Sequence, residues 1–527
     1  MSEPPASSSP SVVSRLVGAA LAVSLLWFVV GRAGMTQSLL AGAGARLKGQ
    51  GPRQVLRVWD WWAPSTNETY AAYFGEIEAA FERENPDVDL ILQFVPFTQY
   101  EQKMATGLVG NTPPDVFQSS VYWAEGFYDR GMLLPLNPLM ERERTEREAR
   151  RARGETVNRG EIVDEEAYLP SAWRHNTKAD GTVFGIPQIL DASALTWNLE
   201  LLRKEGENDP DIRSMFLKKA NGDVDWDHLR WDGVRDWPQF RRIVKRLAKF
   251  GPDGKLVLDS KGEEVQAGFS IHAHGSGASP FEPWSAANGS NFQNVEGTRA
   301  VFANEQGTEA LQFLADLYWK DGVCPTFRRQ LSDDEVFNSG RVACVVAGTW
   351  SGKYITRNTE GKLRFDQTAF PPGPHGDRPT TLTWGNMLVI SRRTRQPELA
   401  WRYIKFVACL NGALRLLRHI GQNSPRRDFY DTPDWREMCR EKPFLTNVPQ
   451  ICASGKKLRH TQINAVNYAT QPIFETLLLR VPEIEKGVGP YPSLAQGLTA
   501  AAGAVDRVFA RYHAQADEWA GRMKDER

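Results

Sequence analysis

Strand-like and helix-like segments alternate across residues 55–140, and this alternation constrains the fold more than any other feature of the chain. The segment opens with the β-rich run VLRVWDWW, and the apolar runs at 88–95 and 115–119 also have the composition of buried strands. The two stretches between these runs carry apolar residues at helical spacing. The order strand–helix–strand–helix–strand predicts a parallel sheet with right-handed crossovers.

Local signals predict where the two helices begin. Ser65 and Glu68 have the spacing of a capping box at the start of the first helix, and Thr98 and Glu101 are expected to cap the second. The apolar face of the first helix is predicted to consist of Tyr70, Tyr73, Phe74, Ile77 and Phe81.

Three later stretches also predict amphipathic helices. The first starts at Asp236 and is closed by Gly251, with Phe240, Ile243, Val244, Leu247 and Phe250 on its apolar face. The second covers 308–322, with Leu311, Leu314, Leu317 and Tyr318 facing inward. The third is C-terminal, with Leu494, Leu498, Ala501, Val505 and Phe509 facing inward. Residues 141–166 follow the alternating segment of residues 55–140 and are dense in charge, which predicts a solvated helix or loop.

The N-terminal 50 residues have the composition of a disordered, polar start followed by an export segment. Residues 16–30 form an apolar run of fifteen residues after Arg15, which is the length of a signal-peptide core and short for a membrane span. Small residues that could precede a cleavage site occur at 31–33 and 43–45. No cysteine follows the run closely, which excludes a bacterial lipoprotein anchor, and cleavage or retention as an anchor remains open.

Composition excludes some classes of partner. The 527 residues carry 64 Lys+Arg and 64 Asp+Glu, so the chain lacks the basic excess of a nucleic-acid or anionic-membrane binder.

Five cysteines at irregular spacing argue against a disulfide framework or a zinc site, and Cys439 and Cys452 are either paired or free. His272 and His274 could share one face of a strand, but no third metal ligand is near them in sequence.

Several motifs in register resemble those of the extracellular solute-binding proteins of ABC importers, the family that includes maltose-binding protein. The motifs of this chain are LRVWDWW, AAFERENPDVDL, Pro114-Asp115-Val-Phe, the run from Tyr128 to Leu139, FGIPQILDASALTWNLELL, Trp284 to Gly289, Phe337 to Trp350, Thr383 to Asn386, and Gly421 to Arg426. The resemblance covers roughly residues 54–512.

The resemblance implies an α/β, two-lobed periplasmic-binding-protein fold of type II-like form, with a ligand cleft between the lobes and crossing hinge strands. A length of 527 residues also favours two domains or more. We expect residues 51–185 and 386–420 to form the first lobe, and 186–385 and 421–527 to form the second.

Ligand-binding candidates follow from the strand ends and from the family pattern. Ligands of open α/β sheets sit beyond the carboxyl ends of strands, which favours Trp61, Trp62, Gln118, Ser119 and Trp123. The resemblance implies that Asp191 bonds sugar hydroxyls and that Trp350 stacks on a ring. It also adds Trp284, Asn288, Trp384, Asn386 and Arg426.

The resemblance implies an exported, monomeric carrier that captures its ligand by hinge closure and delivers it to a membrane permease, without a cofactor, a metal or catalysis. Seventeen tryptophans, together with Gln, Asn and Asp near the strand ends, favour a carbohydrate ligand, and an oligosaccharide in particular. A secreted sugar enzyme such as a glycoside hydrolase is the alternative, because the carboxylate pairs of glycosidases can be far apart in sequence.

Overall fold

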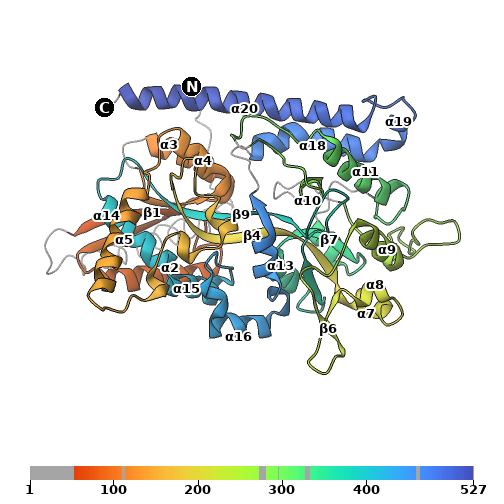
Figure 1. Cartoon of the computed structure of the whole chain (residues 1–527), viewed down its shortest axis with the longest axis horizontal. Coiled ribbons are helices and arrows are strands. Elements are labelled where there is room, and N and C mark those ends of the chain that lie inside the picture. The colour runs from red at the N-terminus through yellow and green to blue at the C-terminus, as the bar shows by residue number, and fades with distance from the viewer. Residues whose placement is uncertain are drawn as a thin grey trace, which may run out of the picture. The chain divides into compact units, whose positions relative to one another are not determined.

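The computed structural model describes residues 53–109, 113–271, 281–294, 296–326, 333–457 and 463–525 (Figure 1). The apolar run at 16–30, both cleavage-site candidates, His272 and His274 lie outside these residues. Within the part of the chain that the structure describes, no helix combines the length and the apolar character that crossing a bilayer requires.

Chain contacts divide the protein into two compact units. The smaller unit comprises residues 1–55 and 84–89, and in its described part the backbone N–H of Gln54 donates to the carbonyl of Asp87 at 2.8 Å. The larger unit comprises residues 56–83 and 90–527, and it contains all of the candidate functional residues described below.

One eight-stranded sheet carries most of the strands, in the order β2-β1-β3-β9-β4-β7, with β10 beside β9 and β8 beside β4. The strands are β1 Gln54–Asp60, β2 Val88–Phe94, β3 Val116–Ser120, β4 Ile186–Asn198, β7 Cys344–Gly348, β8 Phe365–Thr368, β9 Thr381–Ile390 and β10 Gly455–Lys457. β5 Phe216–Lys218 and β6 Val224–Leu229 form a separate pair.

The predicted order of the first segment is confirmed. α2 (Glu68–Glu84) and α3 (Phe97–Val109) alternate with β1, β2 and β3, and β1 pairs with β3 in parallel, Val58 opposite Val116. The predicted capping residue was wrong, because the side chain of Asn67, two residues after Ser65, accepts the N–H of Thr69 at 2.9 Å. α3 begins at Phe97, ahead of the cap predicted at Thr98.

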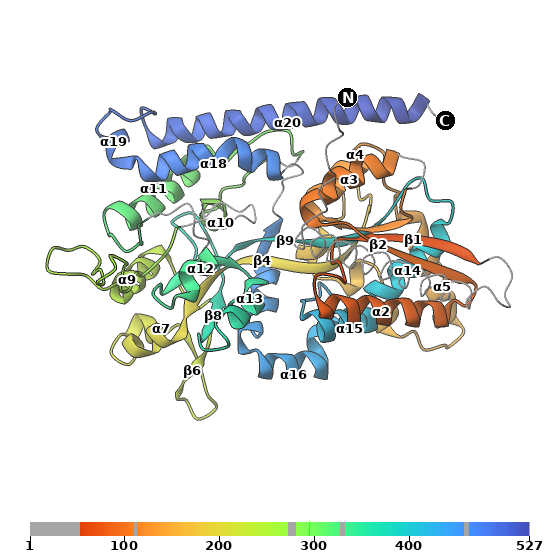
Figure 2. The same cartoon turned by 180° about the vertical axis from the view of Figure 1, so that it is seen from behind.

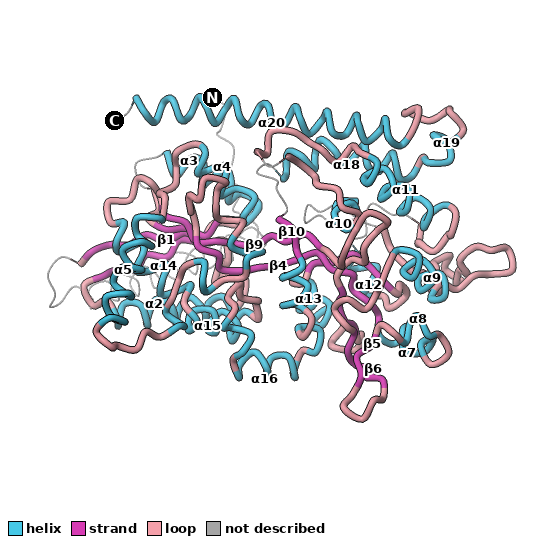
Figure 3. The backbone as a smooth tube through the Cα atoms, in the orientation of Figure 1, coloured by secondary structure: helices cyan, strands magenta, loops and turns pink. Residues whose placement is uncertain are grey.

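Two strands connect the parts of the sheet. The first half of β4 pairs antiparallel with β9, from Ile186 opposite Leu388 to Ala192 opposite Thr383. Its second half pairs with β7 and β8 instead, and β9 continues beyond β4 to pair with β3. All thirteen residues of β4 are buried, as the apolar composition of a strand covered on both faces requires. The chain therefore has two long strands that cross between different groups of strands (Figure 3).

An aromatic core fills the region around α9 (Trp237–Leu247), α10 (Phe281–Ala287) and α11 (Glu305–Trp319). The predicted inward residues of α9 and the three leucines of α11 are buried. Phe250 is an exception, because the backbone turns extended at Ala248 and leaves Phe250 beyond the helix and partly exposed.

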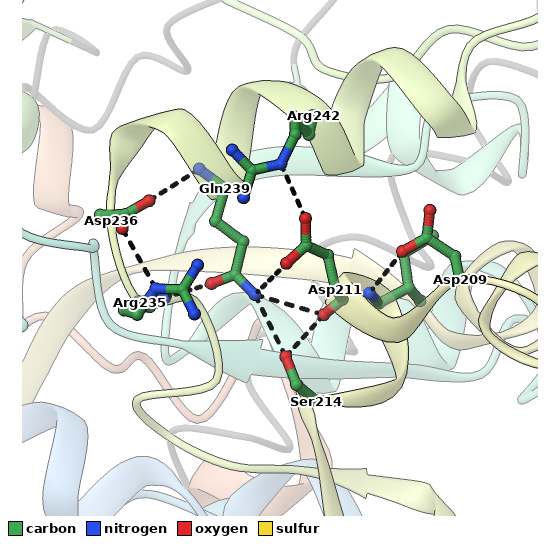
Figure 4. Close-up of polar contacts among 8 residues, drawn as sticks. Asp209, Asp211, Ser214, Arg235, Asp236, Gln239 and Arg242 are labelled. Atoms are coloured by element: carbon green, nitrogen blue, oxygen red, sulfur yellow. Dashed lines mark hydrogen bonds and ion pairs between the residues drawn. The ribbon is translucent and has the colours of Figure 1, made fainter.

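Side-chain hydrogen bonds fix the start of α9 against α8 (Pro210–Arg213), as Figure 4 shows. Asp236 Oδ1 accepts the N–H of Gln239 at 2.7 Å, which caps the helix. The Gln239 amide donates to Ser214 Oγ at 3.1 Å and to Asp211 Oδ1 at 3.3 Å, and its oxygen accepts the N–H of Arg235 at 2.6 Å. Arg242 completes the group by donating to Asp211 Oδ2 at 2.7 Å.

The C-terminal helix α20 (Leu494–Asp525) runs alongside α18 (Ile463–Leu479), as Figures 1 and 2 both show. Its five predicted inward residues are buried in the same aromatic core, which confirms that face. Further along α20, Tyr512 lies against Gly126 of α4 (Val121–Asp129), where a Cβ would meet the Tyr512 hydroxyl at 2.9 Å.

The charge-dense stretch forms α5 (Asn137–Ala152), whose polar residues are mostly exposed, as predicted. Arg147 pairs with Asp164, and Lys405 of α14 (Pro397–Ala408) pairs with Glu143, so the segment is tied to its neighbours. All five cysteines are free thiols, and Cys439 and Cys452 do not form a disulfide.

Candidate functional site

Two of the candidate tryptophans lie together beyond the carboxyl ends of β1 and β3. The ring centroids of Trp61 and Trp123 are 5.9 Å apart at an interplanar angle of 80°. Tyr100 lies edge-on to Trp61 at 5.0 Å, and its hydroxyl donates to the carbonyl of Trp59 at 3.0 Å. Trp61 is half-buried, so the aromatic group is anchored in the core and still offers indole surface.

Trp350 and Trp384 form a second aromatic pair, with ring centroids 5.0 Å apart. Trp350 follows β7 and immediately precedes α13 (Ser351–Asn358), and its ring folds back over Gly348. A Cβ at Gly348 would lie 1.8 Å from that ring, so this placement requires glycine. Trp384 belongs to the apolar cluster that contains Trp123, and Trp61 and Trp350 pack against that cluster. Four of the predicted residues therefore meet in one cluster, called the shared aromatic surface below: Trp61 and Trp350 are half-buried in it, and Trp123 and Trp384 are buried.

Asp191 lies in β4 directly opposite Trp384 of β9. Thr349, the residue before Trp350, donates its hydroxyl to Asp191 Oδ1 at 3.1 Å and accepts the N–H of Ala192 at 3.1 Å. Burial raises the pKa of Asp191 to about 6, and the nearby charge of Lys353 opposes that rise. The same burial lowers the pKa of Lys353, which projects from the first turn of α13. A carboxyl group thus lies beside the tryptophan pair, oriented by a threonine.

Asp60 is a second buried carboxyl group beside the tryptophans, and the sequence analysis did not select it. Its Oδ1 accepts the N–H of Trp62 at 2.8 Å, and burial raises its pKa to about 7. The sequence did contain a signal for Asp60. It is a polar residue at the end of an apolar strand, which is the kind of position that selected the other candidates. Trp62 stacks on Tyr70, with ring centroids 5.9 Å apart. Burial raises the pKa of Tyr70, the nearby Tyr354 of α13 adds to that rise, and the charge of Arg357 on the same helix opposes it.

Three other candidates make their contacts outside the shared aromatic surface, namely Trp284, Asn288 and Arg426. Trp284 is fully buried among Trp237, Phe240 and Phe313, with centroid distances of 5.8, 4.8 and 5.2 Å. The Asn288 amide donates to Glu309 and to the carbonyl of Gln306, each at 2.9 Å.

Arg426 forms an ion pair with Asp428 at 2.7 Å and donates to the carbonyls of Ile162 and Ala408. Its guanidinium also lies 5.6 Å from the ring centroid of Tyr168. With no more than 1% of its surface exposed, Arg426 holds loops together in this structure.

The strand candidates are also engaged. Gln118 donates to Gln188 at 2.8 Å, and Ser119 donates to the carbonyl of Ser120 at 3.2 Å; both are fully buried in β3. Asn386 is half-buried in β9 opposite Ser120. Of the polar candidates, Asp191 is the one that lies directly beside a tryptophan of the shared aromatic surface.

A third buried acid, Asp366 of β8, permits a test of these titration shifts outside the shared aromatic surface. It accepts the backbone N–H groups of Leu229 and Gln367, each at 2.7 Å, and burial raises its pKa to about 8. The folded protein therefore holds this proton more tightly than the unfolded chain does between pH 4 and 8. Across that window the free energy of unfolding should fall as pH rises.

Asp366→Asn should flatten that fall by up to about 1.4 kcal/mol per pH unit. Urea unfolding of the wild-type protein and the variant at several pH values between 4 and 8 measures the difference. Parallel pH profiles for the two proteins would show that Asp366 does not titrate in this range.

Known proteins share both sequence and fold with this chain. The model of the family described as bacterial extracellular solute-binding protein matches residues 63–408. Maltodextrin-binding protein MdxE of Bacillus subtilis is 22% identical over 347 residues, which cover 65% of this chain and 68% of that protein.

Two solved structures extend the likeness to most of the chain. The cyclic alpha-maltosyl-1,6-maltose binding protein of Arthrobacter globiformis is 17% identical, with a TM-score of 0.62 over 87% of this chain and 99% of its own. The sugar-binding protein MalE of Xanthomonas citri is 19% identical, with a TM-score of 0.61 over 87% of this chain and 98% of its own. The predicted α/β, two-lobed fold is thereby confirmed. The family match covers well over half of the sequence, and the chain belongs to the bacterial extracellular solute-binding protein family.

Proposed function

We propose that the protein captures a carbohydrate, an oligosaccharide in particular, and delivers it to the permease of an ABC importer. The observation that carries the ligand class is the shared surface of Trp61, Trp123, Trp350 and Trp384 with Asp191 beside it. Aromatic faces stack on the apolar faces of sugar rings, and a carboxylate accepts hydrogen bonds from hydroxyl groups. The names of the relatives agree with this ligand class, since they include maltodextrin and cyclic maltosyl-maltose binding.

We assign the lobes as residues 51–185 with 386–420, and 186–385 with 421–527. This division is supported by β4, whose two halves pair with different strands, and by β9, which bonds to both β3 and β4. Trp61 and Trp123 would then belong to the first lobe and Trp350 to the second. Closure about β4 and β9 would bring both sets of rings onto one ligand and exclude water from it.

The remaining predicted residues have either a direct or an indirect role in this proposal. Trp62 follows Trp61 and Asn386 is two residues after Trp384, and we assign both to the edge of the shared aromatic surface. Trp284, Asn288, Gln118, Ser119 and Arg426 act indirectly, through the packing and bonds that hold the binding residues in place.

The protein works outside the cytoplasm as a monomer, in keeping with a family of extracellular binding proteins. Residues 16–30 direct export, and they are either removed or retained as an anchor. The carrier needs neither a cofactor nor catalysis, because capture and release change only the position of the solute. A glycoside hydrolase is less well supported, since the matched family is one of binding proteins.

A thermal-shift panel tests the ligand class. We expect maltooligosaccharides or related neutral oligosaccharides to raise the melting temperature in a concentration-dependent way. Amino acids, glycerol phosphates and simple salts serve as the contrasting members. The oligosaccharide that produces the largest shift is then incubated with the protein and recovered unchanged by chromatography.

The outcomes separate the alternatives. A shift with charged solutes alone would reject the carbohydrate assignment while leaving a carrier possible. Conversion of the oligosaccharide to smaller products would favour the hydrolase instead.

A further inference from the structure

Three metal-ligating side chains converge on the surface of the part of the protein that contains α11. Glu305 and Glu309 lie on the first two turns of α11, and His375 comes from the loop between β8 and β9. One ligand atom from each lies within 4.8 Å of the other two. The helical spacing of four residues places both carboxylates on one face, where the imidazole can meet them.

A buried carboxamide positions two of these groups. Asn288 donates to Glu309 Oε2 at 2.9 Å, and its oxygen accepts the backbone N–H of His375 at 3.1 Å. Because Asn288 is fully buried, it anchors the carboxylate and the histidine backbone to the same point, directly after the end of α10. Outer hydrogen bonds of this kind orient metal ligands and raise their affinity.

Close backbone packing holds the histidine loop in place. A Cβ at Gly373 would lie 2.3 Å from Asn288 Oδ1, and one at Gly376 would lie 2.1 Å from the carbonyl of Ala287. Gly289 has φ +86°, and its Cβ position lies 3.0 Å from the carbonyl of His375. The loop thus presents His375 from a tightly packed base.

The two acidic side chains of the cluster favour a bound cation. His375 Nε2 lies 3.2 Å from one Glu309 oxygen and 3.3 Å from the other, while Glu305 supplies a second carboxylate close by. Glu305 and Glu309 are both acidic and lie four residues apart on one face of α11, where like charges repel. A divalent ion would remove that repulsion and use all three groups.

We propose that Glu305, Glu309 and His375 bind one divalent transition-metal ion, with Zn²⁺ as the best match. Imidazole and carboxylate ligands together suit Zn²⁺, and three protein ligands leave a position for water. None of the three residues belongs to the aromatic surface of Trp350, so this site is separate from the proposed carbohydrate site. The bound ion would fasten the loop that leads into β9 to α11. This proposal does not depend on the identity of the transported solute.

Calorimetric titration of Zn²⁺ into the chelator-treated, untagged full chain tests the site. We expect saturable binding of one ion per chain. His375→Ala and Glu309→Gln should each weaken that binding at least about 10-fold. When chelator is present, the melting temperatures of the variants should match the wild-type value, because the exposed His375 contributes little to packing.

His228→Ala is the matched control. His228 pairs with Asp225 at 3.0 Å, which is a similar histidine–carboxylate contact without a third ligand in the described residues. Zn²⁺ binding should survive this substitution unchanged. The proposal is overturned if the wild-type chain shows no saturable binding, or if His375→Ala and Glu309→Gln bind Zn²⁺ as tightly as the wild-type chain.

Discussion

Trp284→Ala is expected to lower the free energy of unfolding by about 3–5 kcal/mol, because it leaves a large cavity in the aromatic core. The indole is fully buried, and its ring lies 4.8 Å from Phe240 and 5.3 Å from Phe370. Urea unfolding followed by circular dichroism measures the loss. Trp284→Phe keeps an aromatic ring in the site and should lose clearly less stability.

This result would establish Trp284 as a core residue, although the family pattern selects it as a ligand contact. A loss of less than about 1 kcal/mol for the alanine variant would contradict the packing described here. Sugar binding by the Trp284→Phe variant should remain close to wild type, since the ring does not reach the shared aromatic surface.

Trp350→Ala is expected to have the opposite pattern, with a large loss of affinity and a small loss of stability. Removal of an aromatic anchor at the centre of a binding site typically costs 2 kcal/mol or more, so the Kd for the oligosaccharide should rise about 30-fold. The indole is half-buried and contacts Trp384 on one side, which leaves surface for a ligand. Titration calorimetry with the oligosaccharide from the thermal-shift panel measures the change.

Trp319→Ala provides a matched control at another accessible tryptophan. Trp319 ends α11, its indole donates to the carbonyl of Leu478 at 2.8 Å, and it is not among the residues of the shared aromatic surface. Its replacement should leave the Kd unchanged. Wild-type affinity in Trp350→Ala, or a stability loss as large as that of Trp284→Ala, would remove Trp350 from the site.

Helix faces were predictable because they depend on spacing within a short stretch of chain. The inward residues of α20 and the leucines of α11 are buried as their periodicity indicates. Helix starts were less predictable, since Ser65 and Asn67 are both good capping residues and local sequence does not decide between them. Phe250 fits the pattern of α9 but falls beyond the point where the backbone leaves the helix.

The site was predictable only in part, because core and surface tryptophans look alike in a sequence. Trp284 and Trp350 both follow the family pattern, yet Trp284 is enclosed by aromatic side chains of the core and Trp350 borders the shared aromatic surface. Lys353 is near Asp191 only because α13 follows β7, which pairs with β4. Likewise, His375 contacts Glu309, although the two residues are 66 positions apart in the sequence. Such contacts depend on tertiary packing.

The central claim is that an oligosaccharide binds between two lobes that close upon it. Small-angle X-ray scattering during a titration with the panel's best oligosaccharide tests this claim most directly. We predict a radius of gyration that falls and then levels off as the binding site fills, with no change when a non-binding sugar is added. An unchanged radius of gyration at full occupancy, with occupancy confirmed by calorimetry, would contradict capture by hinge closure.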